Sequence, residues 1–288
     1  MIWVETILNG IFLGGLYGLL GLGLALVFGV MRVINVSHGE FIVLAAYLGV
    51  LLTASFPAIH PLFLLVPIVI AMFAIGWVFQ ATMLNRVVES RNMIVPMLVT
   101  FGVSIVLRNG MLETFGANPK AIDAGDFARA SFQVGGLNIG IMPLATLLIS
   151  VLLFAGLQFL IRRTQSGRMI RATADNPQIM RLMGVNPKRV YAVVMGISLA
   201  LAGIAGLLLA MRTSFAANSG GDRILIAFEV VVLGGLGSFW GALLAGILLG
   251  VVQLVGFRFD GNSGLLYAHI LFFLFLIVRP NGLFGARQ

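Results

Sequence analysis

The side chains of this sequence that could do chemistry are few, and they lie within or beside long apolar blocks. Ionisable groups inside a membrane are costly and usually functional, although a long side chain near the end of a span can reach water. We expect two groups of residues to line or gate a pathway, and for His38 and Glu40 the alternative is a structural clasp that holds a break in the chain. The first group is Asn35, Ser37, His38, Gly39 and Glu40, and the second is Glu229, Gly235, Gly237 and Ser238.

The sequence lacks the patterns of a catalytic or metal site. Its three histidines, His38, His60 and His269, do not have the spacing of metal ligands, and it contains no cysteine. We expect His269 to be a packed or interfacial histidine. There is no GxxxxGKS/T string, so the chain is not expected to hydrolyse ATP. The sequence therefore predicts a non-catalytic protein with no cofactor or metal ion of its own.

Positive charge is concentrated in segment 162–190. This segment holds seven Arg and Lys residues and one acid, Asp175, which leaves +6 of the chain's net charge of +8. Because Lys and Arg are enriched in the cytoplasmic loops of membrane proteins, we place the segment in the cytoplasm.

A short helix is predicted inside this basic segment. Asn176 is a good N-cap, Pro177 suits the first helical position, and Gly184 suits a left-handed C-cap. The resulting helix, 177–183, carries four large apolar side chains: Ile179, Met180, Leu182 and Met183. A short helix with an apolar face framed by arginines fits the groove of a partner protein. The alternative is a basic amphipathic segment that lies on anionic lipid.

The composition predicts an all-α integral membrane protein with a single domain, 1–288. The chain is 60% hydrophobic and 10% charged, with a mean hydropathy of +1.07, whereas soluble domains carry about a quarter charged residues. The ten-residue alternation of a membrane β-barrel is missing. The basic residues lie mostly at the ends of apolar blocks, so the high isoelectric point reflects membrane orientation and not binding to nucleic acid.

About eight spans, within a range of eight to nine, are expected. The candidate blocks are 7–30, 40–55, 62–84, 93–113, 142–161, 190–211, 224–256 and 265–279. Block 224–256 would form a helix of about 50 Å, which is too long for one crossing.

Two breaks are expected in these helices, at 34–40 (INVSHGE) and at 234–241 (GGLGSFWG). Aligning His38 and Gly39 with Trp240 and Gly241 suggests an internal repeat with broken or re-entrant helices, which would mark a translocation pathway. Two ordinary tight turns at a membrane face are the alternative.

The charges also predict the sides of the membrane. With 162–190 inside, loop 114–141 lies outside, where a periplasmic partner could touch it. The tail carries Arg279 and Arg287 and no acid, which favours a cytoplasmic C-terminus.

Several strings resemble the permease subunits of ABC importers for branched-chain amino acids, in the right order and over nearly the whole chain. They are INVSHGE at 34–40, AGIAG at 202–206, LGGLGS at 233–238, RPNGLF at 279–284, and the spacing of Gly167, Arg168, Arg171, Ala172, Asn176 and Gly184. The length is most similar to that of the H-type subunit of the permease pair. Ile179 and Met180 depart from the smaller residues expected in relatives.

The resemblance implies a multi-pass permease in the inner membrane of a bacterium, surrounded by lipid. Its implied partners are a second similar permease, two cytoplasmic ATPase subunits that bind ATP and Mg²⁺, and a periplasmic or extracellular solute-binding protein. Carried over, the ATPase-coupling residues are Gly167, Arg168, Arg171, Ala172, Asp175, Asn176, Pro177, Ile179, Met180, Met183 and Gly184.

The expected function is that of a permease subunit for branched-chain or other hydrophobic amino acids. Related systems that carry urea, short amides or aromatic acids share these motifs and remain alternatives. A more distant alternative is a self-sufficient secondary transporter or channel, because the possible repeat and broken helices occur there as well.

Overall fold

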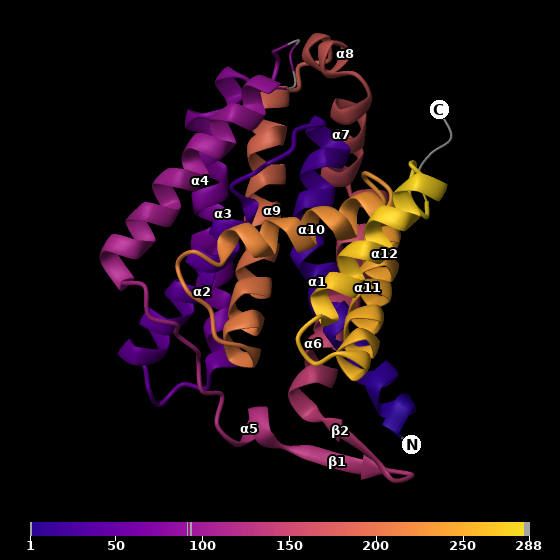
Figure 1. The fold of residues 1–288 in the computed structure, drawn as a ribbon. Helices are drawn as coiled ribbons and strands as arrows, with labels where there is room; N and C mark the ends of the chain where they lie inside the picture. The colour runs from indigo at the N-terminus through magenta and orange to yellow at the C-terminus, as the bar shows by residue number, and fades with distance from the viewer. Residues whose placement is uncertain (1, 91, 93, 285–288) are drawn as a thin grey trace.

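Long apolar helices make up most of the protein (Figure 1). The computed structural model describes residues 2–90, 92 and 94–284. Within them, seven helical segments are long and apolar enough to cross a membrane, and α12 (Gly264–Val278) is a shorter apolar helix. The seven contain α1 (Ile2–Met31), α2 (His38–Ser55), α3 (Leu65–Thr82) with η1 (Pro61–Leu64) and η2 (Leu84–Arg86) at its ends, α4 (Ile94–Phe115), α6 (Ile141–Arg163), α9 (Pro187–Arg212) and α11 (Phe239–Phe259). The predicted all-α bundle of about eight spans is confirmed.

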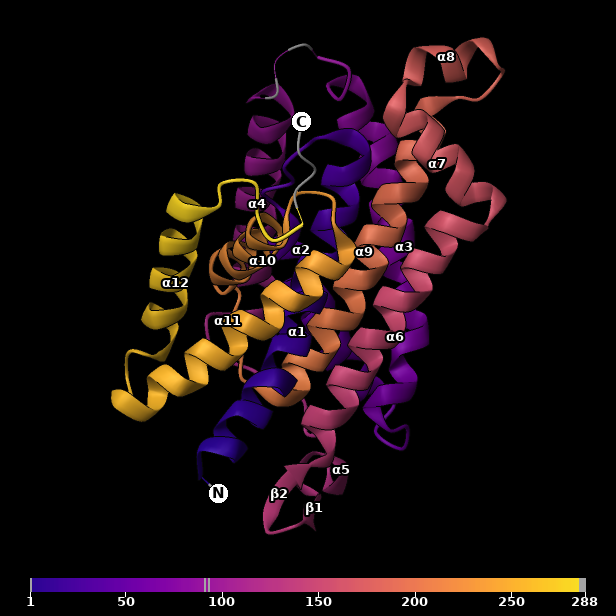
Figure 2. The ribbon, with the colours of Figure 1, turned by 90° about the vertical axis from the view of Figure 1, so that its right-hand side faces the viewer.

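The remaining elements lie at the two ends of the bundle or across it. α7 (Gln165–Asp175) and α8 (Pro177–Leu182) are together at one end of the bundle (Figures 1 and 2). The opposite end holds the N-terminus, α5 (Asp126–Arg129) and the antiparallel hairpin of β1 (Ser131–Val134) and β2 (Leu137–Gly140). Segments 162–190 and 114–141 therefore lie at opposite ends, as the charge pattern predicts.

Helices α1 and α9 form the centre of the bundle. In their most apolar windows, 83% and 78% of the residues are buried, against 22% for α4. α1 packs so closely on α11 that a methyl group on Gly14 would lie 2.3 Å from the Ile247 Cα, and one on Gly246 would lie 2.4 Å from the Gly18 nitrogen. Small residues at both surfaces permit this approach, which is how membrane helices gain packing contacts.

The first expected break follows α1. α1 ends at Met31, Arg32 has a left-handed φ of 53°, and α2 begins at His38. The prediction of a break is confirmed, but its bounds were wrong at the C-terminal side. His38, Gly39 and Glu40 form the first turn of α2, because Ser37 already acts as the N-cap position.

The second expected break divides block 224–256 into two helices. α10 (Gly220–Gly234) ends at a turn in which Gly235 has a φ of 96° and Gly237 a φ of 83°, and Ser238 caps α11 through a hydrogen bond from the Gly241 N–H. A side chain would be strained at either glycine. The later RPNGLF string closes this turn, since Leu283 N and Phe284 N donate to Leu233 O and Gly234 O.

Helix α10 runs across the bundle and not along it. It crosses in front of α1 and α9 at about half their height in Figure 1, and in Figure 2 it is seen nearly end-on. Its buried face packs on the middle of α1, where a methyl group on Gly21 would lie 2.7 Å from Val230 Cγ1. At 15 residues it is about 22 Å long, which is too short to span the membrane core of roughly 30 Å.

The first turn of α10 meets the first turn of α2. A methyl group on Gly39 would lie 2.1 Å from Gly220 O, so the two helix starts touch through backbone. The N-terminal ends of α2 and α10 therefore face each other. The proposed alignment of His38 and Gly39 with Trp240 and Gly241 stays a prediction.

Candidate functional site

The basic segment forms two short helices at one end of the molecule. The predicted helix 177–183 is α8, which ends one residue earlier, at Leu182. A separate helix α7 before α8 was not expected from the sequence. Its signals were Thr164, which caps it through a hydrogen bond from the Gly167 N–H (3.0 Å), and the buried face of Gly167, Ile170 and Thr173 at a spacing of three.

Local hydrogen bonds define both ends of α8, as predicted. Asn176 Oδ1 accepts from the N–H groups of Gln178 and Ile179, each at 3.1 Å. At the other end Gly184 has a φ of 82°, and Val185 N donates to Met180 O while Gly184 N donates to Arg181 O. This pair of bonds is a Schellman motif, which satisfies carbonyls at the helix end.

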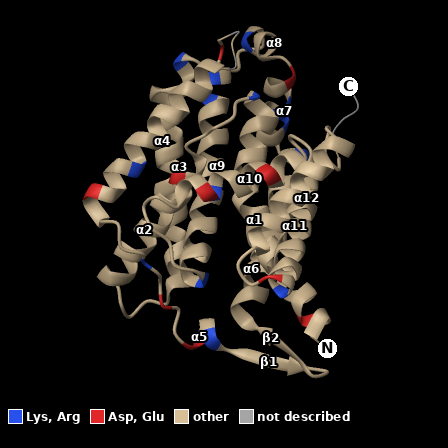
Figure 3. Ribbon diagram, in the orientation of Figure 1, with Lys and Arg blue, Asp and Glu red and all other residues tan. Residues whose placement is uncertain are grey.

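Three large apolar side chains of α8 and the residue after it are exposed, beside the exposed Gln178 and Arg181. Ile179, Leu182 and Met183 are 53%, 89% and 73% exposed. Met180, which we expected on the same surface, is instead buried, because it faces the rest of the bundle at the inner side of this short helix. Lys and Arg residues gather at this end of the molecule (Figure 3).

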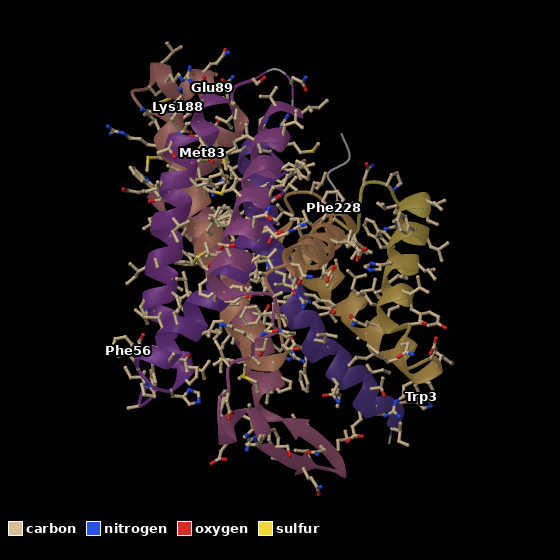
Figure 4. All side chains as sticks on the ribbon, turned by 60° about the vertical axis from the view of Figure 1, so that its left-hand side comes forward. Trp3, Phe56, Met83, Glu89, Lys188 and Phe228 are labelled. Atoms are coloured by element: carbon tan, nitrogen blue, oxygen red, sulfur yellow. The ribbon has the colours of Figure 1, made fainter. Side chains whose placement is uncertain are left out.

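Three contacts attach the two short helices to the membrane helices. Gly167 is buried against the end of α6, where a methyl group would lie 2.2 Å from Leu160 O. Arg171 donates a hydrogen bond to Ile161 O, also in α6. Arg181 forms an ion pair with Glu89, which follows η2. Figure 4 shows Glu89 and Lys188 at this same end of the molecule.

The other expected coupling residues lie on the surface of the two short helices or at their junction. Arg168, Asp175 and Asn176 are exposed, and Ala172 and Pro177 are half-buried. Gly184 is exposed in the turn before α9.

The first group of expected pathway residues is fully enclosed by protein. Asn35, Ser37 and His38 have no exposed surface, and Glu40 is 2% exposed. Asn35 Oδ1 accepts from Ser37 N at 3.1 Å and from Ser37 Oγ at 2.6 Å, and His38 Nε2 donates to Leu20 O of α1 at 3.1 Å. These bonds hold the break against α1 in the way a clasp would, and a role in gating stays a prediction.

Glu40 forms an ion pair in the middle of the bundle. Arg108 of α4 donates through Nε and Nη2 to Glu40 Oε1, at 3.1 and 2.9 Å. Glu40 Oε2 has no hydrogen-bond partner and lies against Gly220, where a methyl group would be 2.1 Å away. The carboxylate therefore lies at the N-terminal end of α10, which favours negative charge.

The second group is divided between a buried pair and a turn. Glu229 of α10 is buried, and its Oε1 lies 2.5 Å from His269 Nδ1 of α12. His269 is thus a packed histidine, as expected, but its carboxylate partner is visible only in the fold. Gly235, Gly237 and Ser238 form the turn before α11 and contribute no charge.

Both ion pairs join helices that are distant in the sequence. Arg108 lies 68 residues from Glu40, and His269 lies 40 residues from Glu229. Among residues 2–90, 92 and 94–284, no group of three or more His, Asp and Glu side chains could hold a metal ion.

Several known permease proteins are similar in sequence to this chain over most of its length. The chain is 29% identical to the high-affinity branched-chain amino acid transport system permease protein BraD of Pseudomonas aeruginosa, over 98% of this chain and 96% of that protein. It is 28% identical to LivH of Salmonella typhimurium with the same coverage, and 28% identical to LivM of Escherichia coli over 93% of this chain and 67% of LivM. No solved structure matches the chain.

The match to a family covers nearly the whole chain. Residues 6–279 match the family described as the permease component of branched-chain amino acid transport systems. This range runs from the second turn of α1 to the end of α12, and it includes both breaks, the two short helices and the ion pairs of Glu40 and Glu229. The chain therefore belongs to the family of permease components of branched-chain amino acid transport systems, a non-catalytic family of multi-pass membrane proteins.

Proposed function

We propose that this chain is one of two permeases in an ATP-driven importer of branched-chain or other hydrophobic amino acids. Its implied partners are a second similar permease, two cytoplasmic ATPases that bind ATP and Mg²⁺, and a solute-binding protein at the opposite face. The observation that carries the proposal is the exposed apolar tip of α8, formed by Ile179, Leu182 and Met183, in a chain that belongs to the permease family. An apolar surface of this kind in water is typical of a protein interface.

The contacts of α8 explain how a push from an ATPase would reach the membrane. α7 connects α8 to α6 through the buried Gly167 and the Arg171 bond to Ile161 O. On the other side, only the Gly184 turn and the Asn186 cap separate α8 from α9, with Asn186 Oδ1 accepting from Lys188 N at 3.0 Å. A displacement of α8 would therefore move α6 and α9 together. In this arrangement the α8 end and the C-terminus face the cytoplasm.

Coupling is tested by placing a charge on the tip of α8. Leu182→Glu is expected to leave membrane insertion intact, because the native side chain is 89% exposed. Burying a leucine side chain stabilises an interface by about 1.5–3 kcal/mol, so ATPase copurification and leucine uptake in proteoliposomes are expected to fall roughly tenfold or more.

The matched control is Val134→Glu on β1, which is 54% exposed at the opposite end and is expected to retain the ATPases. Wild-type ATPase binding and uptake in Leu182→Glu would contradict the proposal. Leucine uptake by the chain without ATPases would favour a secondary transporter, and uptake of urea, amides or aromatic acids in place of leucine would change the cargo.

A further inference from the structure

A groove lies between α3 and α4, at the side of the bundle away from α12 (Figure 1). Residues within 74–83 form one wall, residues within 99–107 form the other, and the buried Phe41 of α2 closes the bottom. The volume of the groove is about 740 Å³, within the roughly 300–1,000 Å³ of ligand-sized pockets. Val78 and Val106, one on each wall, are exposed, so the groove is open at the surface of the bundle.

The chemistry of the groove suits a hydrocarbon chain. None of the described residues that line it carries a charge, and its one hydroxyl, on Thr82, already donates to Val78 O within α3 at 2.7 Å. The rings of Phe41 and Phe79 lie against each other at the bottom, with centroids 5.2 Å apart. A ligand in this groove would therefore meet only apolar surface, which excludes the charged groups of an amino acid cargo.

The groove covers about half of the membrane depth. Its lining on α3 runs from Ala74 to Thr82, about 12 Å at 1.5 Å per residue, against the roughly 30 Å of a whole hydrocarbon core. This is the second half of α3, which leads to Met83 and then to Glu89 at the α8 end of the molecule (Figure 4). With the α8 end in the cytoplasm, the groove lies in the cytoplasmic leaflet.

Positive charge lies at the cytoplasmic end of the groove. The Arg86 N–H donates to Met83 O at 3.3 Å in η2, and side chains three residues apart in a 3-10 helix lie above one another. The exposed Arg86 is therefore directly beyond Met83, which lines the groove. Asn85 Nδ2 donates to Lys188 O at 3.2 Å, so the exposed Lys188 is beside the same turn. Neither base belongs to an ion pair of residues 2–90, 92 and 94–284.

A phospholipid explains both the groove and the charge beside it. Interfaces between membrane helices are enriched in small residues, whereas this groove is lined mainly by large Val, Ile, Leu and Phe side chains. The surface of the cytoplasmic leaflet is negative, and basic residues beside a crevice between spanning helices bind anionic headgroups there. α4 is the least buried of the seven spanning segments, so an acyl chain would supply packing that its neighbouring helices do not.

We propose that the groove between α3 and α4 binds one anionic phospholipid of the cytoplasmic leaflet, with an acyl chain between Val78 and Val106 and the phosphate group at Arg86 and Lys188. This inference rests on the proposed function for the orientation of the chain in the membrane. The apolar walls give affinity for the acyl chain, and the two bases select a negative headgroup over a zwitterionic one.

The test is native mass spectrometry of the intact transporter, extracted from vesicles of phosphatidylcholine and phosphatidylglycerol. The wild type is expected to retain phosphatidylglycerol in preference to phosphatidylcholine. Gly102→Leu fills the groove from α4 without a clash, since a methyl group there meets nothing within 4 Å, and it is expected to weaken retention roughly tenfold, the effect of displacing about two methylene groups. Arg86→Gln and Lys188→Gln are each expected to weaken it about fivefold.

Each change has a matched control. Gly110→Leu adds the same side chain to α4 outside the groove, where a methyl group also meets nothing within 4 Å, and Arg279→Gln removes an exposed charge at the end of α12. Both are expected to retain phosphatidylglycerol as the wild type does.

Unchanged retention in Gly102→Leu, or equal retention of the two lipids by the wild type, would overturn the inference. Separation of the two permeases in Gly102→Leu would also overturn it, because the second permease would then be what covers the groove. A complex that retains phosphatidylglycerol as expected but shows no ATP-dependent leucine uptake would overturn the proposed function alone.

Discussion

Replacing Arg108 by methionine is expected to destabilise the protein strongly, because it leaves a buried carboxylate without its charge partner. Glu40 is 2% exposed, and both of the described hydrogen bonds to its Oε1 come from Arg108. Removing one member of a buried ion pair costs about 3–5 kcal/mol. At roughly 2–4 °C per kcal/mol, the midpoint of thermal unfolding is expected to fall by about 6 °C or more.

A double-mutant cycle in detergent, followed by size-exclusion chromatography of heated samples, measures this effect. Glu40→Gln in the Arg108→Met background removes the stranded charge and is expected to restore much of the loss, so that the two changes are not additive. The matched control is Arg129→Met, since the Arg129 and Asp123 side chains are 76% and 72% exposed at 3.4 Å, and such a pair contributes at most ~1 kcal/mol. Similar midpoints for Arg108→Met and Arg129→Met, or additive losses in the cycle, would refute the reasoning.

Two further predictions concern the ends of the bundle. Gly167→Ala would place a methyl group 2.2 Å from Leu160 O, so α7 is expected to shift and the ATPase activity stimulated by the binding protein is expected to fall. The control is Gly156→Ala in α6, where the added methyl group meets nothing within 4 Å and no effect is expected. Equal activity in the two variants would contradict this prediction. The hydroxyl of Ser263, and next the backbone N–H of Asn262, hold the pKa of Asp260 below its usual range. Because the ionised carboxylate accepts these hydrogen bonds, its contribution to the turn between α11 and α12 is present above the ordinary aspartate pKa and is lost as the pH falls through the lowered value. Ser263→Ala is expected to raise the pKa of Asp260 in an NMR titration, and an unchanged pKa would contradict this.

The parts of the fold that follow local rules were predictable from the sequence. Asn176, Pro177 and Gly184 predict the limits of α8 to within one residue, because caps act on their own neighbours. The length of block 224–256 and its glycines predict a break, and the structure places it at Gly235 to Ser238. Exposure was harder to predict, since a helix as short as α8 has no clear periodicity, and Met180 proved to be buried.

The contacts between helices were not predictable, because they depend on packing across long sequence distances. Nothing near Glu40 indicates Arg108, and nothing near Glu229 indicates His269. The sideways course of α10 has the same origin. Its apolar residues suit a spanning helix equally well, and only the meeting of Gly39 with Gly220 shows where it begins.

The bonds from Leu283 and Phe284 join the end of α10 to a part of the chain that is synthesised later. Leu233 O and Gly234 O accept hydrogen bonds from these two backbone N–H groups, which are translated only after α11 and α12. A carbonyl left unsatisfied in lipid costs free energy, so the nascent α10 is expected to stay at the insertion machinery or the membrane surface until the tail has emerged. The final placement of α10 is therefore expected to follow the synthesis of the last part of the described chain.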